Sequence, residues 1–281
     1  MGRRTKKRDL ADIPPGHHTP LDYALASRDT KTLDMVKAAI MHKQVLLAYQ
    51  PIVNAADLKT PAFYEGLIRV LDDTGRIIPA KDFMDTIEDT EIGRQMDCLA
   101  LETGLEALAR YPALRLSINM SARSIGYRRW TKSLERALDD HPHIAERLIL
   151  EISEKSAMHV PELVIDFMDD LQAKGISFAL DDFGSGFTSF KYFKDFFFDI
   201  IKFDGQLTRD IHLDQENQII AGGISNIARN LDMLTIASRV ERREDATVLS
   251  DLGFNCLQGF LFGAPTVKPP WENRKSKRSA A

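Results

Sequence analysis

The sequence predicts an α/β protein built as a closed barrel of eight strands with helices around it. From Leu33 onward, short runs rich in β-branched and aromatic residues alternate with longer stretches of helical spacing. This alternation is typical of strand–helix units that form parallel sheets. Eight strands with such connections fit a barrel better than an open sheet, so the predicted class is a TIM-like (β/α)8 barrel.

The predicted elements follow one another along the chain in a regular order. The predicted strands cover residues 45–51, 63–69, 114–119, 148–152, 177–181, 199–203, 234–237 and 256–259. Segments between them place apolar residues at helical spacing. These predicted helices cover residues 80–110, 129–139, 161–174, 218–231 and 244–252. We therefore expect the helices to pack on the outside of the barrel.

Composition and cysteine content exclude several classes of protein. With 281 residues, of which 44% are hydrophobic and 28% charged, the chain can form one large domain or two small ones. A formal net charge of -4 argues against DNA binding, which requires a basic footprint. Cys98 and Cys256 lie far apart without metal-ligand spacing, so we expect neither a disulfide framework nor a thiolate zinc site.

Basic residues are concentrated at the two ends of the chain. Residues 1–32 form a basic and polar leader that we expect to be partly disordered, residues 33–266 form the domain, and residues 267–281 form a basic tail. Such charge runs are usually solvated, and contact with a membrane surface or a partner is the alternative. We find no transmembrane run and no secretory signal, so we expect a cytoplasmic protein.

Polar side chains gather at the predicted strand ends. A single Asp after a strand is usually a turn former or a helix cap, but here several strands share the feature. Because the C-terminal strand ends of a barrel converge on one face, we expect a single site. Clustered carboxylates need a neutralising cation, and oxygen ligands favour Mg²⁺ or Mn²⁺. The residues concerned are Glu65, Asn119, Glu151, Asp181, Asp182, Lys202 and Asp204.

Short motifs occur in order through residues 33–266. Residues 64–69 read Tyr-Glu-Gly-Leu-Ile-Arg, and residues 181–186 read Asp-Asp-Phe-Gly-Ser-Gly. Together with residues 50–53, 119–121, 151–154, 202–204 and 258–265, they resemble the EAL domain family. Catalytic members of that family hydrolyse cyclic di-GMP to linear pGpG. The resemblance implies an EAL-type variant of the barrel.

The resemblance also implies a metal centre. It places a first ion on Glu65, Asn119, Glu151 and Asp181. A second ion would lie between Asp181, which bridges, and Asp182. Two ions arranged in this way hold an attacking water and stabilise the charge that develops on phosphorus and the leaving oxygen.

Further roles follow from the resemblance for residues around the metals. Lys202 matches a lysine that orients or activates the water, and Arg69 matches a contact to the substrate phosphate. The same resemblance assigns substrate binding to Gln50, Leu67 and Gln258 as well as Arg69. It assigns catalysis to Asp204 and Glu241 as well as Lys202. It also implies that Glu154 anchors the loop that begins at Asp182.

The chain departs from the family pattern after the seventh predicted strand. Where the family has Ala-Glu-Gly-Val-Glu, residues 237–241 read Ala-Ser-Arg-Val-Glu. In the family the glutamate replaced by Ser238 contributes to the second metal site and is a proposed general base. A serine hydroxyl is neutral and shorter, so the second metal should bind weakly or not at all. Arg239 replaces the glycine and either points into solvent or reaches a phosphate. Gly66, at the middle of the signature, could loosen the position of Glu65.

Three functions remain open. We favour a degenerate EAL domain that binds cyclic di-GMP, or a partner protein, with weak or absent hydrolysis. The first alternative is an active phosphodiesterase in which Glu241 moves and rescues the second metal. The second is a protein-interaction module that binds no nucleotide. The candidate contact surface of such a module is the aromatic run Phe193, Phe196, Phe197 and Phe198, near which the family often forms homodimers. The alternative is that these rings fill the core between the barrel and its helices.

Overall fold

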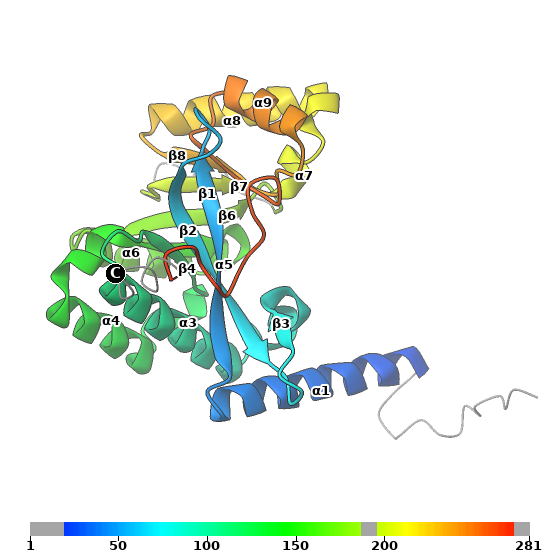
Figure 1. Cartoon of the computed structure of the whole chain (residues 1–281), viewed down its shortest axis with the longest axis vertical. Coiled ribbons are helices and arrows are strands. Elements are labelled where there is room, and N and C mark those ends of the chain that lie inside the picture. Colours follow the sequence, from blue (N-terminus) through cyan, green and yellow to red (C-terminus); the bar gives the residue numbers. More distant parts are fainter. Residues whose placement is uncertain (1–19, 187–195, 273–281) are drawn as a thin grey trace, which may run out of the picture.

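The computed structural model describes residues 20–186 and 196–272, and its strands close into a barrel (Figure 1). The order of the strands in the barrel is β1-β9-β8-β7-β6-β5-β4-β2, and a further pairing of β1 with β2 closes the sheet. This confirms the predicted barrel. The strands are β1 (Val45–Asn54), β2 (Pro61–Leu71), β3 (Ile77–Pro79), β4 (Leu116–Asn119), β5 (Leu148–Ser153), β6 (Ser177–Phe183), β7 (Ile200–Phe203), β8 (Leu234–Ala237) and β9 (Cys256–Gln258).

The barrel is mixed rather than wholly parallel. β1 runs antiparallel to both β2 and β9, whereas the other neighbours around the barrel are parallel. Residues 55–60 connect β1 to β2. A connection this short suits only an antiparallel pair, because parallel strands need a crossover of about a dozen residues or more. β3, which the sequence pattern did not predict, extends the sheet beyond β2.

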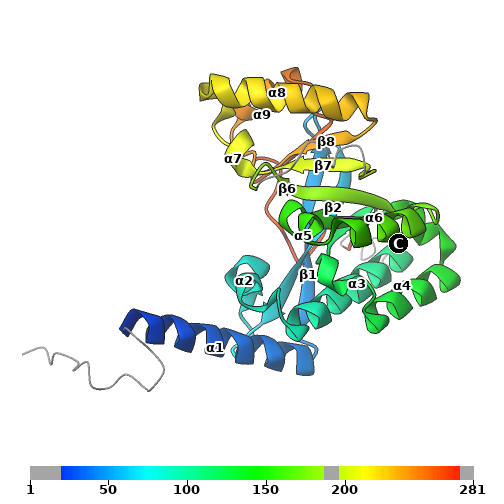
Figure 2. The ribbon, with the colours of Figure 1, turned by 180° about the vertical axis from the view of Figure 1, so that it is seen from behind.

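Helices surround the barrel on the outside (Figures 1 and 2). Four predicted helices are found within a few residues of their expected bounds, namely α4, α6, α8 and α9. The helices are α1 (Pro20–Met41), α2 (Met84–Ile87), α3 (Glu91–Arg110), α4 (Arg128–Asp140), α5 (Glu154–His159), α6 (Pro161–Gln172), α7 (Gly205–Thr208), α8 (Gln215–Asn230) and α9 (Arg243–Asp251). Short 3₁₀ turns are η2 (Ala80–Asp82), η3 (Ala122–Ser124), η4 (Pro142–Arg147) and η6 (Ile211–Leu213).

One expectation about helices requires correction. Residues 80–110 form η2, α2 and α3 rather than one helix. The hydroxyl of Thr90 accepts a hydrogen bond from the Ile92 N–H at 3.2 Å, so it caps a new helix within this segment. At the N-terminal end, α1 begins at Pro20, so its first residues belong to the segment 1–32. Proline suits the first position of a helix, where its missing N–H is not needed.

An apolar layer inside the barrel fixes the level of the polar residues above it. Residues from seven strands form this layer: Ile52, Phe63, Ile149, Ala179, Ile200, Ile236 and Cys256. Inward-facing side chains on one strand are two residues apart. The next inward level, which we call the polar layer, is therefore formed by Gln50, Glu65, Glu151, Asp181, Lys202, Ser238 and Gln258.

The aromatic run after β6 contributes mainly to the core. Phe196 and Phe198 are buried and stack with ring centroids 5.4 Å apart. Phe197 is 68% exposed, and Phe193 lies outside the described residues. The run therefore offers only one exposed ring, Phe197, within the part of the chain that the structure describes. Among the described helices, none combines the length and apolar character needed to cross a bilayer.

Candidate metal and phosphate site

Three carboxylates of the polar layer form an acidic cluster. Glu65 lies on β2, Glu151 on β5 and Asp181 on β6. One carboxylate oxygen from each lies within 4.8 Å of the others, a spacing from which all three could bind one cation. Each carboxylate comes from a different strand at the same level, so the barrel itself, rather than a flexible loop, sets their separation.

The ammonium group of Lys202, on β7, lies among the three carboxylates. Its Nζ is 3.3 Å from Glu65 and 3.2 Å from Asp181, and it donates a short hydrogen bond to Glu151. Burial by itself would lower the pKa of Lys202, but the charges of Asp181, Glu151 and Glu65 raise that pKa well above its usual value. Lys202 is therefore a permanent cation at the centre of the acidic cluster.

Glu65 is the most fully bonded carboxylate of the cluster. Its Oε1 accepts a hydrogen bond of 2.7 Å from Asn119 Nδ2, and its Oε2 accepts one of 2.6 Å from Gln258 Nε2. Burial acts to raise the pKa of Glu65, but the charge of Lys202 and the two amide hydrogen bonds outweigh it, so the pKa is lowered. Gln50 extends this series of hydrogen bonds. It accepts a hydrogen bond from Gln258 at 3.3 Å and donates one to the Gly263 carbonyl at 3.1 Å.

Glu151 has an oxygen without a partner. Its Oε1 is buried and makes no hydrogen bond within the described residues. Burial, followed by the charge of Glu65, raises the pKa of Glu151 to about 8. A buried carboxylate oxygen with no donor is costly unless a cation meets it. The donor set of Glu65, Glu151 and Asp181, with the Asn119 amide beside them, therefore fits a divalent metal ion that prefers oxygen ligands.

Asp182 lies next to the last residue of β6, and the loop that follows the strand is held by Glu154. Asp182 is exposed and adopts a left-handed φ of 53°. Partial desolvation, followed by the charge of Asp181, raises the pKa of Asp182 to about 6. The buried Glu154 Oε2 accepts hydrogen bonds from the Gly184 N–H at 2.9 Å and the Gly186 N–H at 3.3 Å. These two contacts tie the buried Glu154 to the loop after β6.

A cavity of 690 Å³ opens above the acidic cluster. Arg69 stands in its wall, donates to the Ile68 carbonyl at 2.8 Å, and has its pKa lowered by burial. Lys81 and the 66% exposed Phe260 also line the cavity, although the sequence analysis did not identify them. The residues of the predicted site that line it are Gln50, Glu65, Leu67, Arg69, Asp181, Asp182, Lys202, Ser238, Arg239, Glu241 and Gln258.

Ser238 directly follows the end of β8, at the level of the polar layer, and contributes no charge. The Ser238 N–H donates to the Phe203 carbonyl at 3.2 Å, and its carbonyl accepts from the Thr208 hydroxyl at 2.5 Å. Its backbone is therefore fixed on the level at which the family has a glutamate. A neutral hydroxyl at this point means that the end of β8 supplies no carboxylate at the level of the acidic cluster.

Arg239 lies along the rim of the cavity rather than away from it. Its Nη2 is 3.7 Å from Asp204 Oδ2, and its side chain is 63% exposed. Arg239 adopts a left-handed φ of 58°, a conformation that suits glycine and costs other residues about 1 kcal/mol or more. Asp204 itself is buried and caps α7 by accepting from the Gln206 N–H at 2.8 Å.

Glu241 points toward the outside of the site. Its carboxylate is 3.4 Å from Arg209 Nη2, and both side chains are substantially exposed. Glu241 lines the cavity but does not belong to the acidic cluster of Glu65, Glu151 and Asp181. The structure thus brings the residues expected for the first metal together, whereas Asp182 and Glu241 stand outside that cluster.

Similar proteins are known both by sequence and by structure. The chain is 27% identical over 237 residues to the cyclic di-GMP phosphodiesterase PdeF of Escherichia coli, covering 83% of this chain and 31% of PdeF. It is 28% identical over 270 residues to the probable cyclic di-GMP phosphodiesterase PdeA of Escherichia coli, of which it covers 36%. The chain thus spans about a third of the length of these curated relatives.

A solved structure shares the fold over almost its whole length. The PaMucR phosphodiesterase in its c-di-GMP complex has a TM-score of 0.74 and 27% sequence identity, covering 86% of this chain and 99% of that one. A manganese and cy-diGMP complex of Klebsiella pneumoniae BlrP1 has a TM-score of 0.69 and 26% sequence identity, and the match covers 79% of this chain and 56% of that one. Residues 33–265 match the family model of the EAL domain. Since this match takes in most of the sequence, the chain belongs to the EAL domain family.

Proposed function

We propose that this EAL domain binds cyclic di-GMP in the cavity above the acidic cluster and hydrolyses it weakly or not at all. The observation that carries the proposal is the contrast within the polar layer. Glu65, Glu151 and Asp181 are assembled around Lys202, while β8 presents the neutral Ser238. The domain keeps the groups for one metal ion and lacks a carboxylate for a second on this wall.

The proposed ligand is supported by the relatives and by the chemistry of the cavity. PaMucR and BlrP1 have structures with this nucleotide, and PdeF is named for its hydrolysis. Arg69, Lys81 and Arg239 place cationic side chains on the cavity wall, where phosphate oxygens are favourable partners. Mg²⁺ or Mn²⁺ is the proposed ion, since carboxylate and amide oxygens suit both. The proposal includes a cytoplasmic location, where such a nucleotide is available.

Weak hydrolysis follows from the missing carboxylate. Besides the bridging Asp181, a second ion would find only Asp182, whose pKa is raised, and Ser238 is neutral. A two-metal site stabilises both the attacking and the leaving oxygen, and one ion cannot do both equally well. Losing general base catalysis alone lowers rates by about a hundredfold to ten-thousandfold. We therefore expect a receptor that retains its ligand.

One observation favours an active phosphodiesterase as the second candidate. The ion pair of Glu241 with Arg209 is exposed, and such pairs contribute only about 0–1 kcal/mol. Glu241 could therefore leave Arg209 and turn toward a second ion. The interaction module that binds no nucleotide has less support, because such a module has no need for three carboxylates gathered around a buried lysine.

A homodimer is part of the proposal, and helix α8 is the surface that supports it. Ile219, Ile220 and Ile227 are 76%, 47% and 38% exposed, and nothing lies within 4 Å of a Cβ built on Gly223 between them. In a two-fold antiparallel pair centred on Gly223, Ile219 meets the second copy's Ile227. Light scattering should report a dimer that Ile219→Glu disrupts and Leu163→Glu, on α6, leaves intact.

Calorimetry with cyclic di-GMP in Ca²⁺ tests the binding proposal directly. The wild-type chain should bind the nucleotide, and Glu151→Gln should weaken metal-dependent binding by at least tenfold, because it removes a charged ligand. The variant Lys174→Gln, on the surface after α6, is the matched control. Absence of nucleotide binding by the wild type would refute the proposal and leave the interaction module.

A further inference from the structure

Helix α4 carries its charges in the reverse of the order that stabilises a helix. Anions are favourable at a helix N-terminus and cations at its C-terminus. α3 obeys this rule, with Thr90 as its cap, Glu91 in its first turn and Arg110 in its last. α4 begins with Arg128 and Arg129, ends with Asp139 and Asp140, and has no side-chain cap at Tyr127.

α8 follows the same favourable order as α3. Its N-cap Asp214 accepts a hydrogen bond from Asn217, and the helix places Glu216 in the first turn and Arg229 in the last. The reversed order in α4 is therefore not a general property of the helices around this barrel. A local arrangement that disfavours its own helix is expected where a surface serves another purpose.

Three cations of α4 form a ridge, which we define as Arg128, Lys132 and Arg136. They stand four residues apart, so they recur about every 6 Å along one side of the helix. All three are exposed. Acidic residues follow at Glu135, Asp139 and Asp140, but within the described residues no ion pair or hydrogen bond is found for the three ridge side chains.

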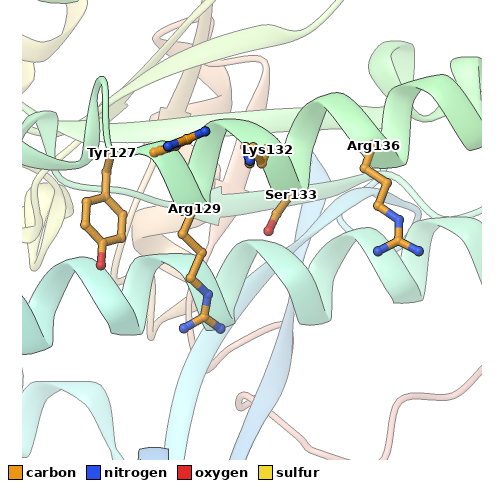
Figure 3. Close-up of a pocket in the computed structure, with 6 residues that line it drawn as sticks. Tyr127, Arg129, Lys132, Ser133 and Arg136 are labelled. Carbon is orange, nitrogen blue, oxygen red and sulfur yellow. The ribbon is translucent and has the colours of Figure 1, made fainter.

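The ridge borders a hollow of 830 Å³ on the surface of α4 (Figure 3). Arg129 and Arg136 extend toward α3 in this view, and Arg129 bonds Glu102 of α3 at 2.9 Å. Arg129 is therefore used in holding the two helices together. The ridge differs from it, because none of its three side chains forms an ion pair with a carboxylate of the described residues.

The surroundings of the ridge decide which anionic partner it fits. Insertion into a membrane needs exposed apolar side chains, but Trp130 and Leu134 of α4 are buried. Stacking of nucleic-acid bases needs a free aromatic face, but Tyr127 bonds Glu91 and has Arg94 near its ring. In an acidic helix with carboxylates four residues apart, these carboxylates recur about every 6 Å, which is also the spacing of the cations along the ridge.

We propose that the ridge of α4 docks an acidic helical segment of a partner protein. Carboxylates of that segment would pair with Arg128, Lys132 and Arg136, and they would also place negative charge near the N-terminus of α4, whose own first turn has no acidic residue. The proposal is independent of nucleotide binding, since none of the three ridge residues lines the cavity above the acidic cluster.

Fluorescence anisotropy with designed peptides tests the proposed partner chemistry. The probe is a labelled alanine-based helix with glutamates at positions i, i+4 and i+8. At about 50 mM salt, where screening is modest, it should bind wild type at least tenfold more tightly than its glutamine counterpart. Arg128→Glu/Lys132→Glu/Arg136→Glu should abolish this difference. Lys59→Glu/Arg115→Glu/Lys174→Glu, which changes the same charge on exposed cations elsewhere, should preserve it.

Two outcomes would overturn the proposal. One is equal loss of peptide binding in both triple variants, which would mean that net charge alone governs it. The other is binding to vesicles rich in phosphatidylserine or to single-stranded DNA without binding to the acidic helix. The melting temperature of the variants tests whether the ridge serves the fold. Arg128→Glu should raise the melting temperature by about 1–3 °C, because a carboxylate then faces the N-terminus of α4. A fall would show that Arg128 serves the fold.

Discussion

The two sides of the polar layer share one level of the barrel but differ in charge. On β2, β5 and β6 the inward side chains are the carboxylates of the acidic cluster, whereas β8 places Ser238 there. The apolar layer beneath continues under both sides, with Ile149 on β5 and Ile236 on β8. The lower layer therefore holds the fold, and one side chain per strand above it decides the chemistry. A strand can therefore keep its position in the barrel when its inward side chain is no longer a metal ligand.

The neighbouring residue strengthens the contrast. Arg239 keeps a left-handed φ of 58° at a position where the family has glycine, and its guanidinium lies near Asp204. Random loss of a metal ligand would not require a strained cation beside it. In the proposed complex, Arg239 would contact a phosphate from the β8 wall, and the carboxylates of the opposite wall would hold the metal ion.

The largest expected effect comes from removing the cation of the acidic cluster. Lys202→Met should lower the free energy of unfolding without metal by about 3–5 kcal/mol, because the buried Glu65 and the partly buried Asp181 then lack their compensating charge. Urea unfolding measures this change, and added Ca²⁺ should restore more stability to the variant than to wild type. A loss below about 1 kcal/mol would mean that the carboxylates are protonated or hydrated in the native protein.

The second effect concerns pH and the acidic side alone. Glu151 has its pKa raised to about 8, so the metal-free protein binds a proton there that a metal must displace. Ca²⁺ affinity should therefore rise with pH by up to about tenfold per unit until about pH 8, and then level off. Calorimetry in buffers of different ionisation enthalpy should detect the released proton. Affinity independent of pH would show that Glu151 is not a ligand.

A third variant affects stability and binding in opposite directions on the β8 side. Arg239→Gly should stabilise the fold by about 1 kcal/mol by relieving the left-handed backbone, and weaken cyclic di-GMP binding by about tenfold. Arg239→Ala removes the same guanidinium without relieving the backbone, so it should weaken binding without the gain in stability. Unchanged affinity in both variants would place Arg239 outside the ligand contacts.

The smallest effect is expected at Gly66, next to Glu65 on β2. A Cβ built there lies 2.8 Å from Ile118 Cδ1, the flexible end of a side chain that can shift. Gly66→Ala should change the free energy of unfolding by no more than about 1 kcal/mol and leave Ca²⁺ affinity unchanged. An increase in Ca²⁺ affinity would show instead that Gly66 loosens the position of Glu65.

The acidic side could be predicted from the sequence because it follows strand periodicity. Glu65, Glu151 and Lys202 each lie two residues beyond an apolar side chain of the lower layer, and this spacing is visible without a structure. The closed barrel followed from the same alternation. The hairpin of β1 and β2 could not be predicted, because a short apolar run carries no mark of strand direction.

The β8 side was predicted less completely because its residues lie beyond the strand end. After Ala237 the backbone no longer alternates, so the sequence left both directions open for Arg239 and did not predict that Glu241 pairs with Arg209. Lys81 and Phe260 reach the cavity from irregular segments and carried no periodic signal. Local turns and long-range ion pairs, rather than strand periodicity, set these positions.

The most direct test of the central claim is hydrolysis of cyclic di-GMP in Mg²⁺ or Mn²⁺ by wild type and by Ser238→Glu, with and without Arg239→Gly. We predict that wild type binds the nucleotide with little turnover and that restoring the glutamate increases the rate by about a hundredfold or more. If wild type instead forms pGpG efficiently and Glu65→Ala abolishes this activity, the enzyme works without the β8 carboxylate, and our account of a disabled second site is wrong.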